Sequence, residues 1–198
     1  PLRANYISER TDLKNKKILD VACGGGLLAE ALFSEGAKVS GVDISDVAIH
    51  TAKNHAKKKN IDINYILGEA ENLLPENSEE FDVVTCLEAI EHVPDPNQLV
   101  KTCSDLCKKN GDIFFSTINR NPKSFLFAIV GAEYILNLLP KGTHEYQKFI
   151  KPSELIFMME NNGLKIQELT GMSYNPITKN YWLGKNVDVN YLIHAKKI

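Results

Sequence analysis

Short apolar runs alternate with longer segments of mixed polarity through the first two-thirds of the chain. The runs, which are typical of buried parallel strands, are residues 17–23, 38–43, 63–67, 81–87 and 112–118. Between them, apolar residues recur at helical spacing, as at Leu28, Ala31 and Leu32. Ser45 or Asp46 can cap the helix that follows the second run. This alternation predicts an α/β fold built on a mainly parallel sheet.

One block, residues 119–150, interrupts the alternation after the fifth predicted strand. Residues 124–139 within it are apolar but contain Glu133, and they are too short for the roughly 20 residues of a membrane-spanning helix. Insertions at the carboxyl ends of strands usually build or cover the site of an α/β enzyme. Beyond the block, a helix at 152–161 and strands at 164–169 and 188–194 complete one expected domain over residues 1–198.

Composition narrows the class of protein further. The 198 residues are 43% hydrophobic and 24% charged, which is ordinary for a folded domain. A net charge of −2 argues against a nucleic-acid partner, because such proteins carry a basic excess. The four cysteines form no Cys-x-x-Cys pair, so we expect reduced, buried thiols. The sequence starts at Pro1 without Met or a signal-peptide pattern, so we expect residues to be missing upstream.

A glycine-rich turn joins the first predicted strand to the first predicted helix, and a carboxylate stands on each side of it. Asp20 precedes the turn at Gly24 to Gly26, and Asp43 ends the second strand about 20 residues later, where it can accept hydrogen bonds from ribose hydroxyls. A dinucleotide fold would place a pyrophosphate on this turn, which Asp20 would repel. Asp20 would instead attract an ammonium or sulfonium group. The pattern therefore favours S-adenosylmethionine.

Residues 18–26 resemble the first motif of class I methyltransferases, Leu-Asp-x-Gly-x-Gly-x-Gly. Gly24 and Gly26 match its glycines, whereas Ala22 stands where the first glycine is usual; we expect alanine to be tolerated if its φ is negative. Glu69 and Ala70 follow the third strand, where that class surrounds the adenine. The resemblance implies a Rossmann-like class I methyltransferase sheet, here with an apolar helical insertion after the fifth strand.

An acidic cluster follows the fourth strand. If the segment turns helically, Glu88, Glu91 and His92 can converge, and two carboxylates with an imidazole suit Mg²⁺ or Mn²⁺. A metal bound to catechol oxygens would lower the pKa of the phenol and hold the attacking oxygen. The alternative is that the two glutamates cap the next turn while His92 packs locally.

The chain resembles the UbiG family, the O-methyltransferases of ubiquinone biosynthesis, over nearly its whole length. The matching segments are 86–96, 114–121, 130–136, 140–144 and 174–177. The resemblance implies methylation of phenolic hydroxyls on polyprenylated catechol-type rings, namely 3-demethylubiquinol and 2-polyprenyl-6-hydroxyphenol. A class I methyltransferase of another small acceptor and a non-catalytic lipid-binding assembly subunit are the alternatives.

The family also implies positions for the site. Its cofactor contacts fall on Arg3, Ala22, Asp43 and Leu87, and its Mg²⁺ ligands fall on Glu88, Glu91 and His92.

The same resemblance gives the insertion a role. Residues 124–139, flanked by Lys123 and Lys141, are expected to meet a membrane surface, although a buried lid or a dimer contact would also explain them. His144 and Tyr146 could border the ring pocket. The expected location is cytoplasmic and peripheral on a bacterial inner membrane, or on the matrix side of the mitochondrial inner membrane, where a ubiquinone-biosynthesis complex is a possible partner.

Overall fold

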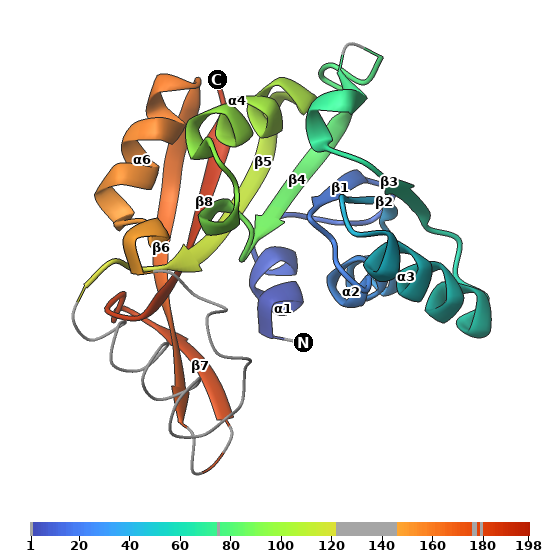
Figure 1. The fold of residues 1–198 in the computed structure, drawn as a ribbon, viewed down its shortest axis with the longest axis horizontal. Helices are drawn as coiled ribbons and strands as arrows, with labels where there is room; N and C mark the ends of the chain where they lie inside the picture. The colour runs from blue at the N-terminus through green and yellow to red at the C-terminus, as the bar shows by residue number, and fades with distance from the viewer. Residues whose placement is uncertain (1, 75, 122–145, 176–177, 179) are drawn as a thin grey trace.

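The computed structural model describes residues 2–74, 76–121, 146–175, 178 and 180–198. This part of the chain forms an eight-stranded sheet with the order β3-β2-β1-β4-β5-β8-β6-β7 (Figure 1). Strands β1 to β5 are parallel, and β8 pairs antiparallel with both β5 and β6. The strands are β1 (Lys17–Val21), β2 (Lys38–Asp43), β3 (Asn64–Leu67), β4 (Phe81–Leu87), β5 (Cys107–Ile118), β6 (Leu164–Asn175), β7 (Asn180–Gly184) and β8 (Asn190–Lys197).

Helices cover both faces of the sheet. The α-helices are α1 (Leu2–Ser8), α2 (Leu27–Ser34), α3 (Asp46–Lys59), α4 (Pro96–Leu106) and α6 (Pro152–Asn161). In the described part of the chain, short 3₁₀ helices accompany them: η1 (Ala70–Leu73), η2 (Ile90–His92) and η4 (Tyr146–Lys148). Ser45, one of the two predicted caps of α3, accepts from the Ala48 amide at 3.3 Å, and Asp95, which caps α4, accepts from the Gln98 amide at 3.0 Å.

The core consists of two apolar clusters, one on each face of the sheet. Successive residues of a strand point to opposite faces, so Phe115 packs with α4 and α6 whereas Phe114 packs with α1, α2 and α3. The four cysteines are buried and free, as the sequence predicts. Among the described residues, no helix is both long enough and apolar enough to cross a bilayer.

The structure differs from the predicted elements mainly near the two ends of the chain. Helix α1 and strand β7 were not predicted, because each is short and neither carries a long periodic pattern. Strand β6 continues to Asn175 rather than ending at residue 169, and β8 runs from Asn190 to Lys197 rather than over 188–194. The predicted apolar helix at 124–139, its flanking lysines and His144 lie outside the described residues.

Candidate active site

A cavity of about 510 Å³ lies at the carboxyl ends of the parallel strands, the edge at which open α/β sheets bind ligands. Of the residues predicted from the sequence, it is lined by Ala22, Asp43, Glu69, Ala70, Glu88 and His92. Ile44, which directly follows β2, also lines it and is 75% exposed. Sequence analysis missed Ile44, although an apolar residue beside Asp43 was a readable signal.

The glycine-rich turn is held against the end of β2 by Asp43. One carboxylate oxygen accepts from the Gly24 amide at 2.8 Å, and the other accepts from the Ser45 amide at 2.8 Å. Gly26 precedes α2 with φ 82°, and a Cβ there would collide with the hydroxyl of buried Tyr65. Glycine is therefore required at position 26 both by the backbone conformation and by close packing.

Ala22 has φ 55°, in the left-handed region, whereas the sequence-based expectation assumed a negative φ. An L-residue is strained there because its Cβ approaches the following carbonyl oxygen. This explains why the methyltransferase motif usually has glycine at the position. The chain has alanine at this position, but the negative φ on which its tolerance was expected to depend is not present.

Asp20 lies behind the cavity rather than in its lining. Its side chain is 3% exposed and accepts a hydrogen bond from the Thr85 hydroxyl at 2.7 Å. Burial, together with the neighbouring charge of Asp43, raises the pKa of Asp20 to about 7 even though the Thr85 bond opposes the shift. Asp20 can therefore attract a cationic ligand through its charge, although it does not line the cavity.

Glu88 is the centre of a polar network that joins three distant parts of the chain. It accepts from the Arg3 guanidinium at 2.8 Å, from the Ser116 hydroxyl at 2.7 Å and from the Asn190 amide at 3.0 and 3.1 Å. Arg3 comes from α1, Ser116 from β5 and Asn190 from β8. The neighbouring Leu87 is half-buried and packs on the apolar cluster beneath α1. Sequence analysis missed Ser116 and Asn190.

Two buried polar atoms beside Glu88 have no hydrogen-bond partner within the described part of the chain. They are the Nε of Arg3, a donor, and the Oδ1 of Asn190, an acceptor. Neither residue lines the cavity itself; both contact it only through Glu88, which does line it.

Glu91 and His92 do not join Glu88 in a metal site. Helix η2 places Glu91 inward, where it is 4% exposed and accepts from the Thr117 hydroxyl at 2.8 Å, whereas His92 is exposed. Burial and the charge of Glu88 raise the pKa of Glu91 to about 7. Nowhere in the described residues are three or more His, Cys, Asp or Glu side chains grouped to hold a metal ion. The residues as arranged do not fit the predicted Mg²⁺ site, because Glu88 and Glu91 are engaged with separate partners and no metal-binding group is formed among the described residues.

Three further histidines do not line the cofactor cavity. His55 lies 2.8 Å from Glu30, His194 is buried 2.7 Å from Asp112, and His50 is exposed.

Comparisons with known proteins agree with this geometry. A family profile described as a methyltransferase domain matches residues 19–115. The fold is similar to magnesium protoporphyrin IX methyltransferase from Synechocystis PCC 6803 with bound S-adenosylhomocysteine, with a TM-score of 0.73 at 17% identity over 99% of this chain and 80% of that one. The sheet, its glycine-rich turn and the cavity at its carboxyl edge define a class I methyltransferase that uses S-adenosylmethionine.

Relatives with higher sequence identity identify the family to which the chain belongs. The ubiquinone biosynthesis O-methyltransferase of Saccharophagus degradans is 56% identical over 100% of this chain and 84% of its own length. The protein of the same name from Acinetobacter baumannii (strain AYE) is 54% identical, with the same coverage. The chain belongs to the family of ubiquinone biosynthesis O-methyltransferases, which confirms the resemblance found in the sequence.

Proposed function

We propose that this enzyme methylates a phenolic hydroxyl of polyprenylated catechol-type rings in ubiquinone biosynthesis, the expected acceptors being 3-demethylubiquinol and 2-polyprenyl-6-hydroxyphenol. Family membership supports the reaction class, and the relatives' names support the pathway. The observation that carries the proposal is the cavity at the carboxyl edge, lined by Asp43 at the end of β2 and by Glu88 after β4.

The residues around that cavity fit S-adenosylmethionine. Glu88 lines the cavity and can accept from the ammonium group of the cofactor, and Arg3 and Asn190 hold the Glu88 carboxylate in place. Asp43 retains acceptor capacity for ribose hydroxyls after binding the Gly24 and Ser45 amides.

The remaining predicted contacts complete this assignment. Glu69 and Ala70 border the adenine, Leu87 offers an apolar or backbone contact, and Ala22 with Gly24 and Gly26 lets the backbone approach closely.

The bound cofactor supplies an electrophilic methyl group on a sulfonium centre. In the transfer, a bond would form between the phenolic oxygen and the methyl carbon while the carbon–sulfur bond breaks, which would release S-adenosylhomocysteine, and the hydroxyl proton would pass to solvent. The chain would contribute alignment: residues at the ends of β1, β2 and β4 line the cofactor cavity, and the partners of Glu88 hold that part of its wall in place. Holding two reactants in line removes much of the entropic barrier to such a displacement.

Turnover of a short-tailed demethylubiquinol analogue tests the proposal directly. Mass spectrometry should show one added methyl group and one S-adenosylhomocysteine released for each product. Asp43→Ala should weaken cofactor binding about tenfold or more, since it loses the ribose acceptor and loosens the turn. Asp46→Ala, an exposed carboxylate nearby that does not line the cavity, is the matched control and should bind normally. Absence of methylated product would overturn the proposal.

The Mg²⁺ expected from the sequence is not used in this proposal, because the arrangement of Glu88, Glu91 and His92 does not fit it. Turnover in EDTA, followed by addition of Mg²⁺, tests the expectation independently. Activity that is lost and then restored would establish a metal requirement.

We further propose that the enzyme is peripheral on a membrane, on the cytoplasmic face in a bacterium or the matrix face in a mitochondrion. Support comes from the sequence: residues 124–139 are apolar and flanked by Lys123 and Lys141. The protein should co-sediment with anionic liposomes. A variant in which a Gly/Ser linker replaces residues 124–139 should stay in the supernatant. Equal sedimentation of both proteins would reject this role for the segment.

A further inference from the structure

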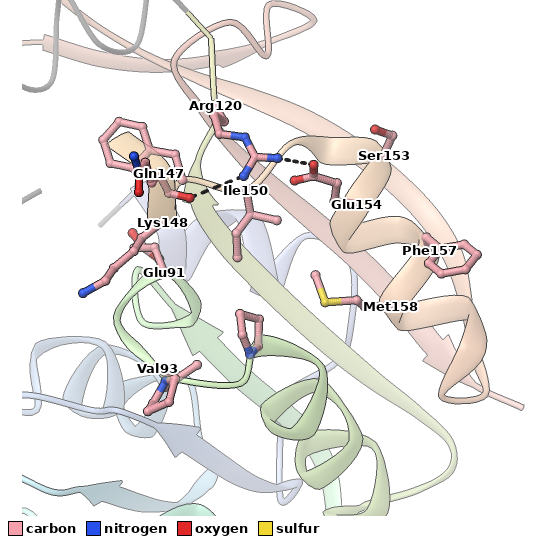
Figure 2. A pocket seen from close by; sticks show the side chains of 13 residues that line it. Glu91, Val93, Arg120, Gln147, Lys148, Ile150, Ser153, Glu154, Phe157 and Met158 are labelled. Atoms are coloured by element: carbon pink, nitrogen blue, oxygen red, sulfur yellow. Dashed lines mark hydrogen bonds and ion pairs between the residues drawn. The ribbon is translucent and has the colours of Figure 1, made fainter. Parts of the chain in front are cut away.

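A second cavity, of about 730 Å³, adjoins the cofactor cavity (Figure 2). It lies between η2, the start of α4 and the face of α6 that carries Phe157 and Met158. Val93 and Pro94 line both cavities, so this short segment is their common wall. The second cavity therefore lies directly beside the cofactor cavity.

Charged side chains in the cavity wall are engaged with protein partners. Arg120 pairs with Glu154 at the start of α6 and also donates to the carbonyl oxygen of Gln147 at 3.4 Å (Figure 2). Glu91 accepts from the Thr117 hydroxyl. Because these side chains are already engaged with protein partners, their pairs do not favour a charged ligand.

Apolar side chains also line the cavity, interspersed with these charged groups. Phe157 and Met158 project from α6 (Figure 2), and Val93, Pro96 and Ile150 are further apolar lining residues. Phe157 is 66% exposed, although phenylalanine is among the residues most strongly favoured for burial. A volume of this size is within the range of about 300–1,000 Å³ that is typical of small-molecule sites.

We propose that this second cavity binds the apolar chain of the phenolic acceptor and holds it against Phe157 and Met158. The inference rests on the proposed function, which supplies an acceptor with an isoprenoid chain. Such a chain has no hydrogen-bonding groups, so apolar contact is the only recognition available to it. The common wall of Val93 and Pro94 sets the place where the ring passes from the chain cavity to the cofactor.

Acceptors that share one ring and differ in chain length test this inference. We would measure KM and kcat at saturating S-adenosylmethionine, without detergent, for rings with no chain, one isoprene unit and two units. Phe157→Asp places a charge in the cavity at an exposed position, so it should fold normally. Phe157→Leu keeps an apolar side chain there. Val47→Asp, on α3, is the control, because Val47 is 76% exposed and lies outside both cavities.

For Phe157→Asp we expect KM to rise about tenfold for the two-unit acceptor and less than about twofold for the chainless ring. Phe157→Leu and Val47→Asp should resemble the wild type, and affinity for S-adenosylhomocysteine should be unchanged throughout. A rise in KM that is independent of chain length, or no rise, would overturn the subsite while leaving the proposed function intact. Loss of liposome binding by Phe157→Asp with unchanged chain-length dependence would also overturn it, in favour of a membrane contact.

A wild-type enzyme that methylates none of the rings would instead overturn the proposed function, and the chain subsite with it.

Discussion

At the residue scale, two non-glycine residues at the rim of the cofactor cavity have left-handed backbones. Ala22 has φ 55° and Glu88 has φ 56°. Each directly follows a parallel strand, at the point where the chain turns out of the sheet. Strained backbones of this kind persist where the surrounding structure holds them, and they cluster at ligand sites. Here the turn at Ala22 brings the backbone to the cofactor, and the turn at Glu88 aims a carboxylate at Arg3 and Asn190.

Ala22→Gly should stabilise the protein slightly. Glycine removes roughly 1–2 kcal/mol of left-handed strain, but it costs about 0.5–1 kcal/mol in unfolded-state entropy. The net gain should be about 0.5 kcal/mol in urea unfolding. Ala31→Gly, within α2, is the control and should lose about 1 kcal/mol. Equal destabilisation by the two substitutions would show that Ala22 is not strained.

Asp20 should make cofactor binding depend on pH. Because the pKa of Asp20 is raised to about 7, the free enzyme holds this carboxyl partly protonated near neutrality. A cationic cofactor favours the ionised form, so affinity should rise with pH up to about 7, and binding should release a proton below that value. Asp20→Asn should remove both effects. Calorimetry in two buffers of different ionisation enthalpy measures the proton released; identical pH profiles for the two proteins would contradict the prediction.

At the element scale, α1 is too short to be stable alone and depends on contacts with the rest of the fold. Arg10, just after the helix, binds both carboxylate oxygens of Glu168 on β6, at 2.5 and 3.0 Å, and donates to the Tyr6 carbonyl oxygen at 2.8 Å. Its guanidinium also lies 3.6 Å from the centroid of the Tyr6 ring. Through this attachment, α1 brings Arg3 to Glu88 at the cofactor cavity.

Arg10→Lys should loosen α1, because lysine cannot form the two-pronged contact with Glu168. We expect a loss of about 1 kcal/mol in unfolding free energy. We also expect weaker binding of S-adenosylhomocysteine, since Arg3 is less well placed. Lys101→Ala, which breaks an exposed pair within α4, should change neither measurement appreciably. If Arg10→Lys lowers stability but leaves affinity unchanged, α1 does not position the cofactor site.

At the scale of the whole molecule, the parallel and antiparallel halves of the sheet meet where β5 pairs with β8. Asp112 lies in this seam, 6% exposed, 2.7 Å from the His194 ring and 2.7 Å from the Lys196 ammonium. His194 also stacks on Phe114, with ring centroids 4.6 Å apart. Burial alone would raise the pKa of Asp112, but the bonds from His194 and Lys196 hold it below its usual value.

Because the pKa of Asp112 is lower in the folded state than in the unfolded state, its ionisation stabilises the fold at any pH above the unfolded-state pKa of about 4. This stabilisation is lost as the pH falls through the folded-state pKa. Asp112→Asn should therefore cost about 1.5–3 kcal/mol at pH 7. The difference from the wild type should shrink once the pH is below about 4. Urea unfolding across this range measures it, with the exposed Asp105→Asn as control. A difference that does not change with pH would assign the loss to packing rather than to charge.

The local sequence determined much of this protein, because a side-chain period and a glycine-rich turn are properties of neighbouring residues. The five parallel strands, α2, α3, α4 and α6, the turn at Gly24 to Gly26 and Asp43 at the end of β2 could all be read in order along the chain. Resemblance then identified the family, which the relatives confirm.

Only the tertiary structure decided how distant residues share a site. Asn190 reaches Glu88 because β8 inserts between β5 and β6, an order that no local pattern contains. Glu88 and Glu91 were expected to converge on a metal. The left-handed turn at Glu88 and the 3₁₀ helix after it instead send them to Asn190 and Thr117, on different strands. Sequence spacing limits where two side chains can point, but the backbone path and the strands packed beside it determine which partners they meet.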